Sequence, residues 1–360
     1  MRNFTSSKLR CLVTLTIVSA FCYFMFYHNT KVLPVTEKAD VLWNRFSDPS
    51  REHSETLYIR HAPDMSKTVR DHRCNTPDDQ AQLLKHIAGF HKVPGIDCPA
   101  LFNNSKSDIE HAKKIARNVS TPLSDSNYIT ITADCRTFVN SRGYILSPLT
   151  KEEEDFPLAF SILAFKEVEM VERLLRAIYR PQNYYCIHVD NKSSELFYNS
   201  VSAIAKCFSN VFVARKRVDV QWGTYTVLEP EIRCMEELWR YPKWKYFIDL
   251  TGQEFPLKTN YELVKILTVY DGANDVEGKV KRANKERWRA PPPFGIRPVK
   301  GAAHITVNRD FVDYILHNET AKALLYWTEK NTSVGVEVFF ATLNHNPQLG
   351  IRGSYKGINF

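Results

Sequence analysis

The chain has 360 residues, of which 44% are hydrophobic and 24% charged. This composition is that of a globular protein and excludes a wholly disordered chain, a collagen-like fibre and a coiled-coil fibre. The net charge is 48 − 40 = +8 and is spread along the chain, which by itself fits a small anionic ligand as well as it fits nucleic acid. The length predicts roughly two domains, or one large domain with appendages.

The N-terminus predicts a membrane anchor. Residues 11–27 form an apolar run without charge, and Arg2, Lys8 and Arg10 precede it. As a helix the run would span about 25 Å, close to the thickness of a thin bilayer. No small-x-small cleavage site follows it, which favours an uncleaved anchor over a cleaved signal peptide. Because the basic flank keeps its side of the membrane cytosolic, we expect 1–10 to be a cytosolic tail, and the rest of the chain to be luminal.

The segment after the anchor is typical of the secretory lumen. Residues 28–94 are polar and poor in aliphatic clusters, so we interpret them as a stem. Outside the anchor the chain has an even number of cysteines, for which disulfides are expected in the lumen: Cys74, Cys98, Cys135, Cys186, Cys207 and Cys234. No cysteine or histidine cluster has zinc spacing, so a metal site is not expected. Five Asn-x-Ser/Thr triplets are candidate glycan sites: Asn103, Asn118, Asn191, Asn318 and Asn331.

The apolar pattern becomes regular from about Cys98, where we expect the folded domain to start. Apolar runs and helical spacing predict, in chain order, a strand at 158–165, a helix at 168–179, a strand at 184–189, a helix at 195–206, a strand at 211–214, a helix at 227–239 and a strand at 246–250. Strands that are apolar throughout and alternate with helices predict an α/β fold of the Rossmann type. We expect a mostly parallel sheet with helices on both faces.

Polar residues follow three of these strands: Lys166 with Glu167, Asp190 to Lys192, and Thr251 to Glu254. Each group alone could be a helix cap or a solvated turn. Together they are expected at one edge, because ligands of parallel sheets bind at the carboxyl ends of strands. No GxGxxG and no GxxxxGK[ST] is present, so neither a dinucleotide fingerprint nor a P-loop is available.

A luminal α/β domain with an anionic ligand suggests a nucleotide sugar. The chain has no D-x-D motif to hold a metal-bridged diphosphate, so Lys or Arg would have to supply the positive charge. The basic segment 277–300 could do so or could be a solvated loop. Trp288 and the prolines 291–293 favour an ordered loop.

Glu337 stands at the start of an apolar helix in the sequence GVEVFFATL. A carboxylate that enters an apolar environment holds its proton more tightly and could serve as a general base. An acidic residue in the first turn of a helix is equally a partner of the helix dipole. The residues alone leave both interpretations open.

Several long segments resemble one enzyme family. DCRTFVNSRGYI, FPLAFSILAFKEVEMVERLLRAIYRPQNYYCIHVDNKS, GQEFPLKTN, NKERW followed by APPP, and EVFFATL are similar to segments of the core 2/I-branching β-1,6-N-acetylglucosaminyltransferases, a family that includes the peptide O-xylosyltransferases. The resemblance runs from about Asp134 to Gly350. It implies a Golgi type II membrane enzyme with a GT-A fold that uses no metal or other cofactor. Such an enzyme transfers GlcNAc from UDP-GlcNAc to a sugar hydroxyl of a glycoprotein O-glycan with inversion, and does not bind nucleic acid.

The resemblance also implies roles for single residues. Glu337 matches the catalytic base, and acceptor contacts match Glu277, Lys285 and Arg287. The uridine and ribose pocket of the donor matches Leu163, Ala164, Phe165, Asp190, Asn191 and Lys192, with Trp222 where branching enzymes usually have Tyr. Two family disulfides match Cys135 with Cys207 and Cys186 with Cys234.

The chain departs from the family after Phe360, where the family continues. That further part supplies the Arg and Lys that neutralise the diphosphate, and the partner of the cysteine matched by Cys98. We therefore expect residues 95–360 to be a luminal catalytic domain truncated at its C-terminus, from a truncated gene model, a short isoform or a protein that has lost catalysis. A β-1,6-branching enzyme is the first hypothesis. The alternatives are a peptide O-xylosyltransferase and a non-catalytic Golgi protein that binds glycans or pairs with an active relative.

Overall fold

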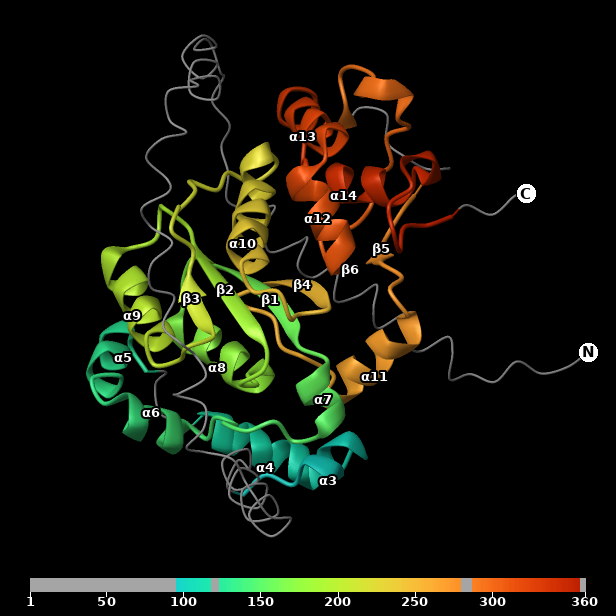
Figure 1. Cartoon of the computed structure of the whole chain (residues 1–360). Coiled ribbons are helices and arrows are strands. Elements are labelled where there is room, and N and C mark those ends of the chain that lie inside the picture. The colour runs from blue at the N-terminus through green and yellow to red at the C-terminus, as the bar shows by residue number, and fades with distance from the viewer. Residues whose placement is uncertain (1–94, 118–122, 280–286, 357–360) are drawn as a thin grey trace, which may run out of the picture. The chain divides into compact units, whose positions relative to one another are not determined.

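The computed structural model describes residues 95–117, 123–279 and 287–356 (Figure 1). The chain divides into two compact units, Met1–Asp64 and Met65–Phe360, and all the described residues belong to the second. The predicted anchor, the stem, Cys74, Asn118 and Lys285 lie outside the described residues. Within the described ranges, no helix is long and apolar enough to cross a membrane.

One sheet forms the centre of the fold. Its order is β3-β2-β1-β4-β6-β5, and the strands are β1 (Leu158–Ala164), β2 (Tyr184–Val189), β3 (Val211–Val213), β4 (Tyr246–Thr251), β5 (Asp275–Val276) and β6 (Ile305–Asn308). The neighbours among β3, β2, β1 and β4 pair in parallel, whereas β6 is antiparallel to both β4 and β5. The mostly parallel α/β sheet expected from the sequence is confirmed. The strands β5 and β6, with the two antiparallel pairings that β6 makes, were not predicted.

Helices connect the parallel strands, close to the predicted bounds: α8 (Val168–Ile178), α9 (Glu195–Ala205) and α10 (Glu229–Trp239). Pro181 follows the end of α8, where Tyr179 is already extended. The start of α10 lies two residues later than predicted, because a single 3₁₀ turn, Tyr225–Val227, comes first and Pro230 occupies the first turn of the helix.

The two faces of the sheet bury different cores. Successive strand residues point to opposite faces, so Leu158, Phe160 and Ile162 join a cluster with α8 and α9. Ala159 joins the other cluster, with α10 and the helices that follow β6. Helices therefore cover both faces of the sheet, as the apolar strands predicted.

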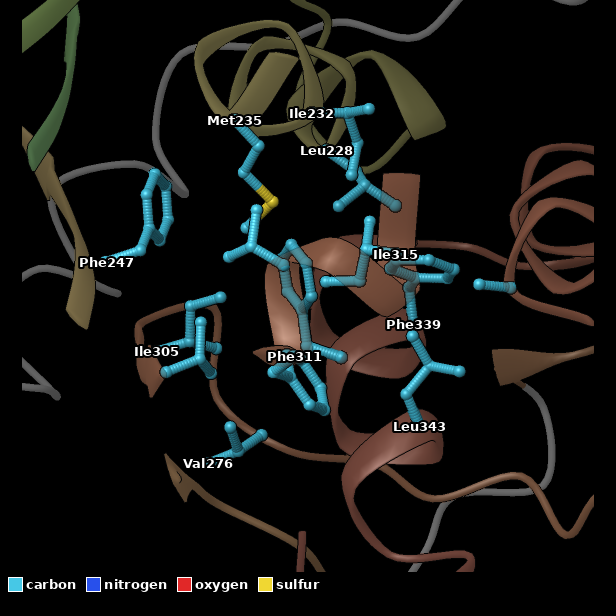
Figure 2. Packing of buried hydrophobic residues seen from close by; sticks show 14 of the residues in the cluster. Leu228, Ile232, Met235, Phe247, Val276, Ile305, Phe311, Ile315, Phe339 and Leu343 are labelled. Carbon is cyan, nitrogen blue, oxygen red and sulfur yellow. The ribbon is translucent and has the colours of Figure 1, made fainter. Parts of the chain in front are cut away.

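The second cluster holds the C-terminal helices α12 (Arg309–His317), α13 (Glu319–Asn331) and α14 (Val336–Asn344) (Figure 2). Phe339 and Leu343 of α14 are fully buried in the same cluster as Phe311 and Ile315 of α12 and Met235 of α10. Each side chain of this size stabilises the fold by about 1.5–3 kcal/mol on burial. The position of α14 is thus fixed by packing.

Six further helices complete the described chain: α3 (Cys98–Phe102), α4 (Lys106–Arg117), α5 (Asp125–Ile131), α6 (Cys135–Arg142), α7 (Lys151–Asp155) and α11 (Asn260–Tyr270). Two disulfides, Cys135–Cys207 and Cys186–Cys234, tie α6 to the end of α9 and β2 to α10. Both pairings implied by the family resemblance are present. Cys98 is exposed and has no disulfide partner among the described residues.

Candidate active site

The carboxyl ends of β1, β2 and β4 meet, as expected of parallel strands. The backbone N–H of Asp190 donates to the carbonyl of Ala164 at 2.9 Å, and that of Gly252 donates to Leu163 at 2.8 Å. A Cβ on Gly252 would lie 3.2 Å from the Ala164 Cβ, so the strand ends pack closely. Phe165 follows β1 and is 46% exposed. The residues predicted to hold uridine therefore form one edge.

Lys192 links this edge to the loop after β3. Its Nζ lies 3.2 Å from the Asp190 carboxylate and 2.9 Å from that of Asp219, and it also donates to the carbonyl of Val220. Partial burial by itself would lower the pKa of Lys192, but hydrogen bonds to Asp219 and Asp190 raise it above its ordinary value. Lys192 is therefore a fixed cation at the strand ends, and Asn191 lies exposed beside it.

Trp222 lies on the same loop and is 70% exposed. The next residue, Gly223, accepts a hydrogen bond from the Val334 N–H at 2.9 Å, and Val334 in turn accepts one from the Glu337 N–H at 3.0 Å. The loop with Trp222 is thus attached to the start of α14. The structure brings this donor-side residue close in the fold to the predicted base.

Glu337 is held between two cations. Its Oε2 lies 3.2 Å from Arg287 Nη2 and 3.3 Å from Lys300 Nζ, and its side chain is 24% exposed. Oε1 has no hydrogen-bond partner among the residues that the structure describes. Of the two interpretations left open by the sequence, the apolar environment is not found at the carboxylate. Val336 and Val338 are buried in the core, whereas the side chain of Glu337 meets ionic neighbours.

The sequence reading did not single out Lys300, the last residue of the basic segment. Its carbonyl accepts from the Lys279 N–H at 2.7 Å, while the Gly301 N–H donates to the carbonyl of Glu337 at 2.7 Å. A Cβ on Gly301 would clash with the carbonyl oxygen of Glu277. Glycine is therefore required where residues 300–301 pass between Glu277 and α14.

The structure thus assembles most of the predicted acceptor side. Arg287 contacts Glu337 directly. Glu277 is connected to it through Gly301, which packs against the carbonyl oxygen of Glu277 and donates its N–H to the carbonyl of Glu337. The Glu277 carboxylate pairs with Lys279 at 2.8 Å and is 41% exposed. Lys285 lies outside the described residues, so its role stays a prediction. Arg287 and Lys300 therefore adjoin the carboxylate, and the loop with Trp222 is attached to the start of the same helix through its backbone.

Comparison with known proteins identifies the family of the chain. The family model for the Core-2/I-Branching enzyme matches residues 158–358, more than half of the chain. The chain belongs to the Core-2/I-branching enzyme family. The resemblance seen in the sequence is therefore confirmed.

Relatives with assigned names are glycosyltransferases. The chain is 35% identical over 289 residues to the beta-1,3-galactosyl-O-glycosyl-glycoprotein beta-1,6-N-acetylglucosaminyltransferase of Bos taurus, an alignment that covers 73% of this chain and 67% of the relative. It is 36% identical over 294 residues to beta-1,3-galactosyl-O-glycosyl-glycoprotein beta-1,6-N-acetylglucosaminyltransferase 3 of Homo sapiens, and the alignment covers 74% of this chain and 66% of the relative. A homologue from Bovine herpesvirus 4 is 39% identical over 244 residues, covering 63% and 55%. By family, the chain is a glycosyltransferase of this kind, and it spans about two thirds of the first two relatives.

A second ionic group in this branching-family chain lies where β4 and β6 adjoin. The His304 ring bridges two carboxylates, with Nδ1 3.0 Å from Asp249 Oδ2 and Nε2 3.1 Å from Glu254 Oε1. These two hydrogen bonds raise the pKa of His304 to about 11. Nearby, Glu231 is fully buried and accepts a hydrogen bond from Ser161 at 2.5 Å, and burial raises its pKa well above the ordinary value.

Only Glu254 of this group was noted in the sequence, as a polar residue after a strand. The other two members of the group are Asp249 of β4 and His304, the residue before β6. They are too far apart in the sequence for a local pattern to connect them. Across the three described ranges, no three His, Cys, Asp or Glu side chains are arranged to hold a metal ion.

Two cavities among the described residues do not coincide with the predicted site residues. A cavity of about 700 Å³ lies between residues 271–273 and 347–356, and none of the predicted site residues lines it. A smaller one, of about 370 Å³, is lined by residues 288–292 with Ile296 and Pro298, directly after Arg287 in the chain. We place the candidate site by its chemistry at Glu337, because its carboxylate lies beside Arg287 and Lys300 and the loop with Trp222 is attached through its backbone to the start of α14.

Proposed function

We propose that this chain transfers GlcNAc from UDP-GlcNAc to the 6-hydroxyl of an O-glycan acceptor on a glycoprotein, with inversion and without a divalent metal. The observation that carries the proposal is the Glu337 carboxylate. Two cations lie 3.2 and 3.3 Å from Oε2, and we assign the proton to Oε1, which has no hydrogen-bond partner among the described residues. The names of the relatives support the donor sugar and the linkage.

In the proposed reaction, Oε1 of Glu337 accepts the proton of the acceptor hydroxyl. The hydroxyl oxygen uses its electron pair to form a bond to the anomeric carbon, on the face opposite the diphosphate. The bond from that carbon to the diphosphate oxygen breaks, and its electrons leave with UDP. One carboxylate suffices because a diphosphate leaving group needs charge stabilisation rather than a proton.

Arg287 and Lys300 position the base in this mechanism. A carboxylate without partners samples many rotamers, whereas ion pairs of 3.2 and 3.3 Å to one oxygen fix the direction of the other. Glu277, Lys285 and Arg287 are proposed to bind the acceptor. On the donor side, we propose that Asp190, Asn191, Lys192 and residues 163–165 hold the uridine and its ribose, with Trp222 as a stacking surface.

The proposed location is the Golgi membrane, with residues 11–27 as a type II anchor in the lipid bilayer and the described domain in the lumen. The basic flank before the anchor and the two disulfides support this orientation.

The test is transfer by the full-length chain, purified in detergent, with UDP-GlcNAc and a Galβ1,3GalNAc acceptor in the presence of EDTA. We expect release of UDP and a product with a new β1,6 linkage. An acceptor that lacks the 6-hydroxyl of GalNAc is the matched control and should give no product. Transfer of xylose from UDP-xylose to a serine peptide, with no GlcNAc transfer, would favour the xylosyltransferase alternative. No transfer and no UDP binding would favour the non-catalytic one.

A further inference from the structure

Four of the five Asn-x-Ser/Thr triplets in the luminal part of the sequence have their asparagine among the described residues, and their surroundings differ. A glycan is bulky and must extend into solvent, so it is compatible only with an asparagine whose side chain is free at the surface. The asparagines to compare are Asn103, Asn191, Asn318 and Asn331.

Asn103 lies at the tip of a peripheral helical hairpin. It ends α3, which spans five residues, and α4 begins at Lys106. Neither helix contains a buried residue, and Asn103 and Asn104 are both exposed. The backbone of Asn103 is fixed, because its N–H donates to the carbonyl of Pro99 at 3.0 Å. Its side chain makes no hydrogen bond to any residue that the structure describes.

Asn318 and Asn331 are partly buried and already engaged. Asn318 joins α12 to α13, and its Oδ1 accepts from the Thr320 N–H at 2.8 Å. The Nδ2 of Asn331, the atom that would carry a sugar, donates to the carbonyl of Trp327 at 3.1 Å. Thr332, the next residue, forms an isolated β-bridge with Trp288, and the Ser333 N–H donates to the carbonyl of Arg287. A glycan on Asn331 would therefore lie against the proposed acceptor site.

Asn191 is exposed, but it lies between Asp190 and Lys192 at the carboxyl ends of the strands. A glycan there would occupy the proposed uridine pocket. Its exclusion therefore rests on the proposed function, whereas the exclusion of Asn318 and Asn331 rests on partial burial and on one side-chain hydrogen bond each, through Oδ1 at Asn318 and through Nδ2 at Asn331.

We propose that Asn103, alone among these four asparagines, carries an N-linked glycan. The proposal rests on the luminal orientation given above, since the modification occurs only in the lumen. The glycan would project from the tip of the α3–α4 hairpin, and the strand ends that form the proposed active site would stay open.

The experiment maps all the sites in one sample. The full-length chain is expressed in eukaryotic cells, and microsomal protein is deglycosylated enzymatically in ¹⁸O water, which converts each glycosylated asparagine to labelled aspartate. Peptide mass spectrometry should find the label at Asn103 and unmodified asparagine at 191, 318 and 331. Asn118 is mapped in the same spectra and does not bear on the proposal.

Two variants support the mapping. Asn103→Gln should lose the mass of one glycan on a gel, whereas Ser105→Thr keeps the triplet and should retain it. Both changes lie on an exposed or half-exposed surface, so neither should unfold the domain.

Three results would overturn the proposal, and they separate its failure from that of the orientation. Label on Asn191, Asn318 or Asn331 shows that the domain is luminal but that the selection is wrong. Unlabelled Asn103 in a domain that intact microsomes protect from protease also refutes the glycan and leaves the orientation standing. Unlabelled Asn103 in a domain that protease digests refutes both.

Discussion

Two ionic groups in this fold combine charges in opposite ways. At Glu337, one anion lies between two cations, Arg287 and Lys300. At His304, one cation lies between two anions, Asp249 and Glu254. Both groups join segments that are distant in the sequence.

The two groups differ in whether an atom that can exchange a proton remains without a hydrogen-bond partner. Both cations at Glu337 lie nearest to Oε2, and Oε1 has no hydrogen-bond partner among the described residues, so we infer that Oε1 can accept a proton. At His304 both ring nitrogens are bonded, and no nitrogen is left to transfer a proton. We infer that the first group performs chemistry and that the second fastens β6 to the turn after β4. The predictions below test this difference.

The largest expected effect is on stability, through the packing of α14, the helix that carries Glu337. Phe339 of α14 is fully buried, and Phe339→Ala should lower the free energy of unfolding by about 3–5 kcal/mol, because it leaves a cavity beneath the helix. Urea unfolding followed by tryptophan fluorescence measures this. Tyr326→Ala on α13, where the side chain is 55% exposed, is the control and should change stability by less than about 0.5 kcal/mol. Equal effects of the two variants would mean that α14 is not fixed by this packing.

Lys300 is expected to have a smaller effect, confined to turnover. Lys300→Met removes one of the two cations that orient Glu337, and kcat should fall about tenfold, the equivalent of about 1.4 kcal/mol in the transition state. The KM values for donor and acceptor should stay near those of the parent, and Lys300→Arg should restore most of the rate. Lys322→Met, which removes a surface ion pair with Glu319, is the matched control. A Lys300→Met variant with unchanged kcat would show that Arg287 suffices.

The smallest expected effect is the pH dependence of stability at His304. The pKa of about 11 in the folded protein is above the unfolded value of about 6.5. The stabilisation is therefore fully present below about pH 6.5 and is lost as the pH rises toward 11. Because the side chain is 54% exposed, solvent screens the group, and the change should be about 1 kcal/mol.

Denaturant unfolding between pH 6 and pH 10 measures this change, and His304→Gln should flatten the curve. The raised pKa values of buried Glu231 and Asp249 act in the same direction, and both are lowered in part by the His304 charge, so the difference between the two curves reports His304 together with its effect on these two carboxyls. Parallel curves would show that the ring is not held as a cation.

Local patterns in the sequence predicted the parallel part of the fold. The apolar runs of β1, β2 and β4 and the helical spacing of α8 gave bounds within one or two residues. β5 has two residues and β6 has four, too short to form a pattern. The position of β6 depends on pairing with β4, more than fifty residues earlier, and that of β5 depends on pairing with β6, which no local signal records.

The site was predictable where residue type and family pattern coincide. Glu337 and Arg287 were identified before the structure brought them together. Lys300 was not, because only the path of the backbone past Gly301 brings its Nζ to the carboxylate. The sequence left two interpretations of Glu337 open, and the structure places it in the first turn of α14 beside two cations rather than in apolar surroundings. The apolar neighbours in sequence lie on the buried side of α14, and the cations come from another segment.

The most direct test of the contrast measures transfer rate and unfolding free energy for Glu337→Gln and His304→Gln beside the parent chain. Loss of a general base should reduce the rate of Glu337→Gln about a hundredfold or more, with stability close to that of the parent. His304→Gln should keep most of the rate and lose stability at neutral pH. A Glu337→Gln variant that retained most of the turnover would contradict the assignment of the base.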